Sequence, residues 1–283
     1  MSTPHAPSVR RLSVGEVTLE VTELGVGDPV VLLHGFPAGA HSWEHQLRAL
    51  ADAGFRAIAP DQRGYAGSDK PREVAAYRVE RLAADVVGLL DALELPRAHL
   101  VGHDWGGAVA WATASLYPGR VERLAVMNGP HPRHAVREIF TNPAQLRRSW
   151  YVFLFQVPFV AEQLLVRRDI GRVLRASAAH PEAIDDALVA RCAEAIRQPD
   201  AARAMLSWYR AAIRYRLPTL PPVLARTLYL WGDLDPAFGP RLAQHLDRYA
   251  RDVEVRHLPD AGHWPQLERP AAVNRHLVEF LRR

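Results

Sequence analysis

The chain has 283 residues, 48% of them hydrophobic and 23% charged, a composition typical of a folded globular protein of enzyme size. Its single cysteine, Cys192, excludes an internal disulfide framework and every multi-cysteine zinc site. We interpret this thiol as a small buried apolar group. The formal net charge of +4 is a mild basic balance that does not by itself indicate nucleic-acid binding, and we expect no nucleic-acid partner.

The sequence also lacks the segments that direct proteins to or across membranes. No stretch reaches the roughly 18 consecutive apolar residues that a spanning helix needs. The first eleven residues, MSTPHAPSVRR, lack the apolar region of a secretory signal. We therefore expect a cytoplasmic protein with no membrane partner.

The first 130 residues alternate strand-like and helix-like segments. Short apolar strands are predicted at residues 17–21, 29–33, 55–60, 99–103 and 123–129. Helices are predicted between them, around residues 43–50 and over residues 79–93 and 106–117. Continuous apolar strands separated by amphipathic helices are typical of a mainly parallel sheet covered on both faces.

The alternation stops near residues 128–134, and the chain is helix-like up to residues 218–222. It then resumes with strands at residues 227–232 and 253–258, a helix near residues 242–249 and a last helix from Pro270. We therefore predict an α/β core domain of residues 1–130 and 221–283, with a helical cap domain of residues 131–220 inserted between two strands. The cap holds 14 arginines and 8 acidic residues, a net charge of +6, which we interpret as a solvated outer face rather than an anion site.

One segment carries the strongest chemical signal. Gly102-His103-Asp104-Trp105-Gly106 stands between a predicted strand and a predicted helix. A glycine on each side of a nucleophile at such a strand-to-helix turn is typical of the elbow that exposes a catalytic side chain in a strained conformation. The nucleophile predicted here is Asp104.

Two further motifs supply partners for this nucleophile. Asp235 follows the strand at residues 227–232, and His263 follows the strand at residues 253–258. The order nucleophile, acid, histidine is the one expected of the α/β-hydrolase arrangement. Asp233 competes with Asp235 for the acid's role, and we favour Asp235. In the same arrangement, the backbone N–H groups of Phe36 and Trp105 would form an oxyanion hole.

The joint set of motifs resembles the α/β-hydrolase-fold epoxide hydrolases, with the haloalkane dehalogenases as close cousins. The resemblance extends from about Val9 to the C-terminus, and it implies a mostly parallel eight-stranded sheet with helices on both faces and an inserted helical cap. The motifs are His-Gly-Phe-Pro at residues 34–37, Asp-Gln-Arg-Gly-Tyr-Ala-Gly-Ser-Asp at 61–69, Gly-His-Asp-Trp-Gly-Gly at 102–107, Trp-Gly-Asp-Leu-Asp at 231–235 and Gly-His-Trp at 262–264.

Residues of the predicted cap distinguish epoxide hydrolases from the related dehalogenases. Epoxide hydrolases of this fold use two cap tyrosines to protonate the epoxide oxygen, and the family's patterns match Tyr151 and Tyr209. Haloalkane dehalogenases commonly hold halide with an asparagine where this chain has Phe36, in addition to the tryptophan that follows the nucleophile. Fluoroacetate dehalogenases usually carry arginine and histidine where this chain has Trp105 and Trp150. The resemblance thus implies substrate contacts from Trp105, Phe36 and Trp150.

The sequence therefore predicts an epoxide hydrolase that needs no cofactor and no metal. Asp104 would form a covalent alkyl ester, and a water activated by His263 would hydrolyse this ester to release a vicinal diol. A small apolar epoxide and water are the expected partners, and homodimer formation is left open. The alternatives are a haloalkane or haloacid dehalogenase with the same aspartate and, less favoured, a non-catalytic ligand-binding protein on the same scaffold.

Overall fold

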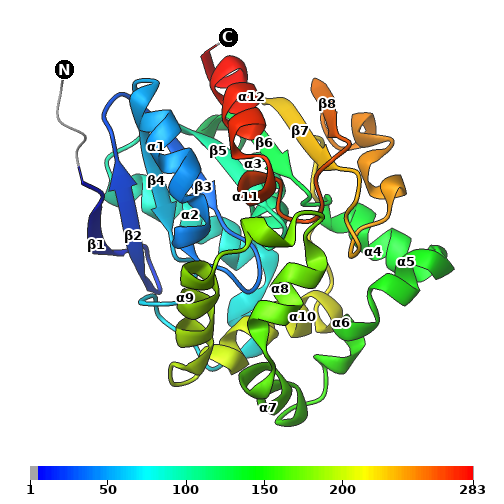
Figure 1. The fold of residues 1–283 in the computed structure, drawn as a ribbon. Coiled ribbons are helices and arrows are strands. Elements are labelled where there is room, and N and C mark those ends of the chain that lie inside the picture. The colour runs from blue at the N-terminus through cyan, green and yellow to red at the C-terminus, as the bar shows by residue number, and fades with distance from the viewer. Residues whose placement is uncertain (1–5, 283) are drawn as a thin grey trace.

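One mixed sheet organises the molecule (Figure 1). The computed structural model describes residues 6–282, so the first part of the segment in which we predicted no secretory signal lies outside the described residues. Within residues 6–282, eight strands pair in the order β1-β2-β4-β3-β5-β6-β7-β8. Their bounds are β1 Ser8–Ser13, β2 Thr18–Leu24, β3 Asp28–Leu33, β4 Phe55–Pro60, β5 Ala98–His103, β6 Val121–Met127, β7 Arg226–Gly232 and β8 Val253–Leu258.

Strand directions confirm the prediction of a mostly parallel sheet. β2 runs antiparallel to β1 and to β4, and all pairs from β4 to β8 are parallel. The carboxyl ends of β3, β5, β6, β7 and β8 therefore meet at one edge of the sheet. Loops at this edge of an open α/β sheet are where ligands bind.

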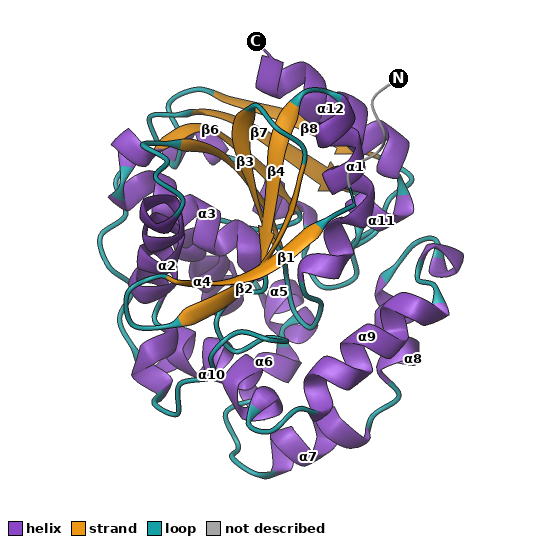
Figure 2. Cartoon of the chain, turned by 90° about the vertical axis from the view of Figure 1, so that its left-hand side faces the viewer, coloured by secondary structure: helices purple, strands orange, loops and turns teal. Residues whose placement is uncertain are grey.

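Alternating side chains of the buried strands pack into two apolar cores, one on each face of the sheet. In β3, Val30 and Leu32 pack into one core, whereas Val31 and Leu33 pack into the other, because successive side chains of a strand point to opposite faces. The first face is covered by α1 (Glu44–Asp52) and α12 (Pro270–Arg282), and the second by α2 (Val79–Ala92) and α3 (Trp105–Leu116) (Figure 2). The short helix α11 (Pro265–Glu268) packs against α12, and its Leu267 belongs to the second core.

A helical insertion separates β6 from β7, as predicted. In both views these helices lie to one side of the sheet, with α7 at the far end of the molecule (Figures 1 and 2). Among residues 6–282, no helix has the length and hydropathy needed to cross a membrane. The inserted helices are α4 Pro132–Thr141, α5 Pro143–Arg148, α6 Trp150–Leu154, α7 Val160–Arg167, α8 Ile170–Ser177, the 3-10 turn η4 Pro181–Ala183, α9 Asp186–Arg197 and α10 Ala201–Arg214.

Two local predictions differ from the structure. The helix predicted near residues 242–249 is wrong: the segment forms two 3-10 turns, η5 (Pro240–Ala243) and η6 (Leu246–Arg248). His245 between them adopts φ 55°, in the left-handed region, which an α-helix cannot continue through. Strand β1 was not predicted, because this edge strand is almost wholly exposed and lacks an apolar alternation. Three other 3-10 turns are η1 Ala40–Trp43, η2 Val74–Tyr77 and η3 Pro118–Arg120.

Candidate active site

Asp104 stands at a strained turn between β5 and α3. Its backbone adopts φ 50° and ψ −119°, a conformation that non-glycine residues rarely adopt and that clusters at functional sites. The chain passes very close to itself here: a Cβ atom on Gly102 would lie 2.4 Å from the carbonyl oxygen of Gly106. A Cβ on Gly106 would lie 2.0 Å from the carbonyl oxygen of Leu33. Both positions therefore require glycine for the turn to close.

The two carboxylate oxygens of Asp104 have different environments. Oδ2 accepts a hydrogen bond of 2.9 Å from the backbone N–H of Phe36, whereas Oδ1 lies 4.0 Å from Nε2 of His263. Burial raises the pKa of the Asp104 carboxyl, and the charge of His263 with the N–H groups of Phe36 and Trp105 opposes this rise. One oxygen is thus held by the backbone, and the other remains available for chemistry.

His263 and Asp235 form a buried ion pair. Nδ1 of His263 donates to Oδ2 of Asp235 at 2.9 Å, and Oδ1 of Asp235 accepts the N–H groups of Ala237 at 2.7 Å and Phe238 at 3.0 Å. Burial by itself lowers the pKa of His263, but the charges of Asp235 and Asp104 outweigh it and raise the pKa to about 9. Burial by itself raises the pKa of Asp235, but His263 and other donors bring it below its usual value.

The rival carboxylate, Asp233, lies elsewhere. Its Oδ1 is 2.6 Å from Nδ1 of His257, and the Asp233 side chain is 34% exposed. The structure therefore brings Asp235, and not Asp233, to His263. Residues 104, 235 and 263 converge although they follow three different strands, because these strands end at the same edge of the sheet.

The two cap tyrosines lie over this edge of the sheet. Tyr151 belongs to α6 and Tyr209 to α10, and their ring centroids are 6.0 Å apart. The ring of Tyr209 also contacts Trp105 at 5.0 Å and Phe36 at 5.3 Å. Burial raises the pKa of both hydroxyls well above the usual value, and the charge of Asp104 raises it further. Both phenols are therefore neutral hydrogen-bond donors near pH 7.

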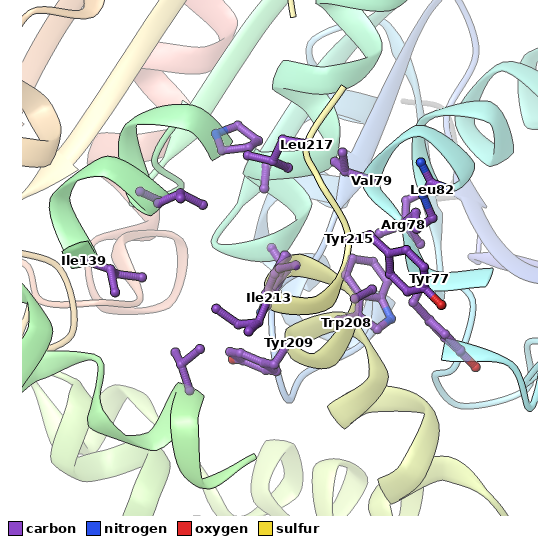
Figure 3. Close-up of a pocket in the computed structure, with 18 of the residues that line it drawn as sticks. Tyr77, Arg78, Val79, Leu82, Ile139, Trp208, Tyr209, Ile213, Tyr215 and Leu217 are labelled. Atoms are coloured by element: carbon purple, nitrogen blue, oxygen red, sulfur yellow. The ribbon is translucent and has the colours of Figure 1, made fainter. Parts of the chain in front are cut away.

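Two mainly apolar cavities meet at Asp104, Tyr151 and Tyr209. The first has a volume of about 120 Å³ and runs between α10 and α2, past Ile213 to Leu82 and Leu217 (Figure 3). The second has a volume of about 240 Å³ and includes Phe36, His263 and Trp150. Trp150 stands at its rim with 54% of the residue exposed, so only part of this side chain faces the cavity.

Comparisons with known proteins identify the family to which the chain belongs. The family model described as α/β hydrolase fold matches residues 28–270. Epoxide hydrolase A of Mycobacterium tuberculosis (strain ATCC 25618 / H37Rv) is 36% identical, with 98% of each chain covered. The chain belongs to the epoxide hydrolase family. This confirms the resemblance that the motifs predicted.

Two further proteins are similar over most of the chain. The AB hydrolase superfamily protein YfhM of Bacillus subtilis (strain 168) is 38% identical, with 94% of this chain and 95% of that protein covered. A crystal structure of a mutant epoxide hydrolase from Bacillus megaterium, in complex with its product (R)-3-[1]naphthyloxy-propane-1,2-diol, superposes with a TM-score of 0.85. That protein is 30% identical, and the match covers 97% of this chain and 100% of that one.

In this member of the epoxide hydrolase family, two residues beside Asp104, Asp235 and His263 were not predicted from the sequence. Asn128, directly after β6, donates from Nδ2 to Oδ2 of Asp235 at 2.7 Å and accepts the N–H of Gly232 on Oδ1 at 2.8 Å. His103 donates from Nε2 to the carbonyl oxygen of His263 at 2.7 Å, and burial lowers its pKa to about 3, so the ring is neutral. The position of Asn128 at the carboxyl end of a central parallel strand was the available signal.

The raised pKa of His263 makes the stability of the protein depend on pH. The ring titrates near 6.5 in the unfolded chain and near 9 in the folded one, so folding favours its protonated form. This contribution to the free energy of unfolding is complete below about pH 6.5 and is lost as the pH rises to about 9. We expect an increase in pH across this range to lower the Tm of the wild type more than that of His263→Gln. Thermal unfolding curves recorded at several pH values measure this difference. Parallel Tm profiles for the two proteins would contradict the shift.

Proposed function

We propose that the protein is an epoxide hydrolase that opens an epoxide to a vicinal diol. The observation that carries this proposal is the placement of two neutral buried phenols, Tyr151 and Tyr209, in the same cavities as the carboxylate of Asp104. Ring opening leaves an alkoxide, which is a poor leaving group without an acid to protonate it. A dehalogenase needs no such acid, because halide leaves as a stable anion. Family membership supports the same activity.

The division into a core domain and a cap domain, predicted from the sequence, is consistent with this proposed activity. We assign residues 1–130 and 221–283 to a core that carries Asp104, Asp235 and His263, and residues 131–220 to a cap that carries both tyrosines. The helices α6 and α10 bring the phenols over the carboxylate, so the acid and the nucleophile approach the epoxide from opposite sides. In-line displacement at carbon needs this opposition of nucleophile and leaving group.

In the first step, Oδ1 of Asp104 attacks one carbon of the epoxide. The new bond joins Oδ1 to that carbon, the ring C–O bond breaks, and a tyrosine hydroxyl protonates the released oxygen. Oδ2 keeps its hydrogen bond from Phe36 and becomes the carbonyl oxygen of an alkyl ester. A proton from the imidazolium of His263 then restores the phenol, and His263 is left neutral.

In the second step, neutral His263 takes a proton from water, which attacks Cγ of the ester. The charge of Asp104 is one cause of the raised pKa of His263, and the ester removes this charge, which lowers the pKa of His263. The tetrahedral oxyanion forms on Oδ2, facing the N–H groups of Phe36 and Trp105. Its collapse breaks the alkyl C–O–Cγ link on the Cγ side, and the imidazolium protonates the departing diol oxygen. Asp104 then ionises and His263 is reprotonated.

The two cavities specify an apolar substrate with room for a substituent on each side of the reacting carbon. Phe36, Trp105 and Trp150 supply aromatic surface at their junction and rim. The naphthyloxy diol bound by the Bacillus megaterium enzyme is a bulky apolar product of this kind. The reaction needs no metal or cofactor, because the leaving group is activated by protonation.

An assay for diol release tests the proposed function. Purified wild-type protein is incubated with styrene oxide and related epoxides, and the diol is quantified by chromatography. Chloroalkanes and bromoalkanes are offered in parallel, with halide release as the readout. Halide release without diol from any epoxide would favour the dehalogenase. Saturable binding of epoxides without any turnover would favour a non-catalytic ligand-binding protein.

The tyrosines can be tested separately. We expect Tyr151→Phe and Tyr209→Phe each to slow epoxide opening by about 10- to 100-fold, and the double variant to slow it by about 10³-fold or more, as for loss of a general acid. Single-turnover measurements isolate this step. Tyr117→Phe, at the end of α3 and away from both cavities, serves as the matched control and should retain the wild-type rate. A double variant that opens epoxides at the wild-type rate would refute the acid role.

A further inference from the structure

A polar cavity of about 120 Å³ lies between α4 and the turns η5 and η6. None of the residues that line it also lines the cavities at Asp104. Figure 1 shows α4 beside the segment that follows β7, and α4 packs against η5. The side chains that matter here are His134, Arg137 and Glu138 from α4 and Arg241, His245 and Arg248 from the segment after β7.

Positive charge exceeds negative charge around this cavity. Three arginines face a single carboxylate, Glu138, which is 5% exposed. Glu138 lies 3.8 Å from Nε of Arg241 and accepts a hydrogen bond of 2.9 Å from Asn142. Within residues 6–282, neither Arg137 nor Arg248 forms an ion pair with an acidic side chain. The guanidinium groups therefore repel one another across the cavity, and an anion placed between them would relieve this repulsion.

A histidine with a buried ring nitrogen, unpartnered in the described part of the chain, also lines the cavity. His134 is 4% exposed, and among the described residues its Nδ1 has no hydrogen-bond partner, while its Nε2 lies 3.9 Å from Glu138. Burial lowers the pKa of His134, and the neighbouring Arg137, His245 and Arg248 lower it further, against the raising effect of Glu138. A neutral ring has one N–H group, and the tautomer that carries it on Nδ1 offers a donor to a ligand. Buried polar atoms normally have a partner, so this nitrogen indicates a ligand contact.

We propose that this cavity binds a phosphate-type dianion, either free inorganic phosphate or the phosphate group of a small monoester. The arginines come from two separate segments, so they approach a ligand from several directions rather than as one planar fork. A tetrahedral anion with several acceptor oxygens matches this arrangement better than a planar carboxylate, which one arginine satisfies in a bidentate manner. The bound anion would link α4, at the start of the insertion, to the segment that follows Asp235.

The proposed site adds a contribution from distant segments to the interpretation of charge drawn from the sequence. The excess of arginine in residues 131–220 was interpreted as a solvated outer face. Arg137 is exposed, and it lines this cavity together with Arg241 and Arg248, which lie outside that region. No count over a continuous stretch of sequence can reveal a cluster assembled from both sides of the insertion.

Calorimetric titration tests the site. Inorganic phosphate is titrated into the full-length protein, with chloride at matched ionic strength and acetate as comparisons, and phenyl phosphate is the probe for monoesters. We expect saturable binding of one phosphate per chain, and a Tm that rises with phosphate concentration. The double variant Arg137→Gln/Arg248→Gln should bind phosphate about tenfold more weakly or worse. Both side chains are exposed, so the variant should fold.

Arg133→Gln is the matched control, because it removes one exposed arginine from the same helix but from outside the cavity. It should bind phosphate as the wild type does. Binding of inorganic phosphate alone would assign the site to the free anion, and binding of phenyl phosphate as well would extend it to monoesters. Equal binding of acetate, equal weakening by Arg133→Gln, or full binding by the double variant would each overturn the proposal.

Discussion

Replacement of Asp104 by asparagine is expected to lower kcat/KM for epoxide hydrolysis by about 10⁴-fold or more, as for loss of other covalent nucleophiles. The amide is uncharged and a poor nucleophile, although it has nearly the shape of the carboxylate. Burial disfavours the charge of Asp104 and raises its pKa, so removal of the charge should leave the Tm unchanged or higher. A thermal unfolding curve measured beside the kinetics therefore separates loss of chemistry from loss of the fold.

Isotope labelling of the wild type tests the same nucleophile without a mutation. In a single turnover in ¹⁸O-water, the diol should carry the unlabelled oxygen of Asp104, and the label should appear on the Asp104 carboxylate. Solvent oxygen in the first diol would refute the covalent mechanism. Asp233→Asn is the matched control for the variant, because it removes a carboxylate that faces His257 instead of the active site. It should retain wild-type activity.

The sequence predicted those parts of the site whose signals are local. The elbow at Asp104 is marked by Gly102 and Gly106, whose positions admit no side chain, and β5 before it is a short buried apolar run. The order of Asp104, Asp235 and His263 followed from the order of the strands, so the convergence of these residues required only that the sheet be parallel. The fold was predictable for the same reason, and the family was predictable from the resemblance of the motifs.

The sequence could not predict features that depend on contacts between distant segments. Asn128 hydrogen-bonds to Asp235 across two adjacent strands. Its position at the end of a central parallel strand places it near the site, but the sequence does not indicate which residue it contacts. His103 is an ordinary neighbour of the nucleophile in sequence, but its ring supports the backbone of His263. Apolar spacing over residues 242–249 resembles that of a helix, and this spacing does not reveal the left-handed conformation of His245 that interrupts it.

Replacement of His263 by glutamine should stop the reaction after its first step. Asp104 can still open the epoxide, but no base remains to activate water. The alkyl ester should therefore accumulate, and the intact protein should gain the mass of one epoxide. Steady-state kcat should fall by about 10³- to 10⁴-fold, as for loss of a general base. Intact-protein mass spectrometry after mixing with styrene oxide measures the adduct directly.

The rate of adduct formation in His263→Gln should depend on pH in a predictable direction. Burial raises the pKa of Asp104, and the charge of His263 opposes this rise; without His263, the pKa should therefore rise further. Alkylation in the variant should become faster as the pH increases, with an acidic limb at higher pH than in the wild type. His257→Gln removes a histidine that is also paired with an aspartate, but outside the site, and it should form diol normally without a lasting adduct. Absence of an adduct in His263→Gln at every pH, with Asp104 intact, would mean that alkylation itself requires the histidine. The proposal that Asp104 acts in the first step and His263 in the second would then be wrong.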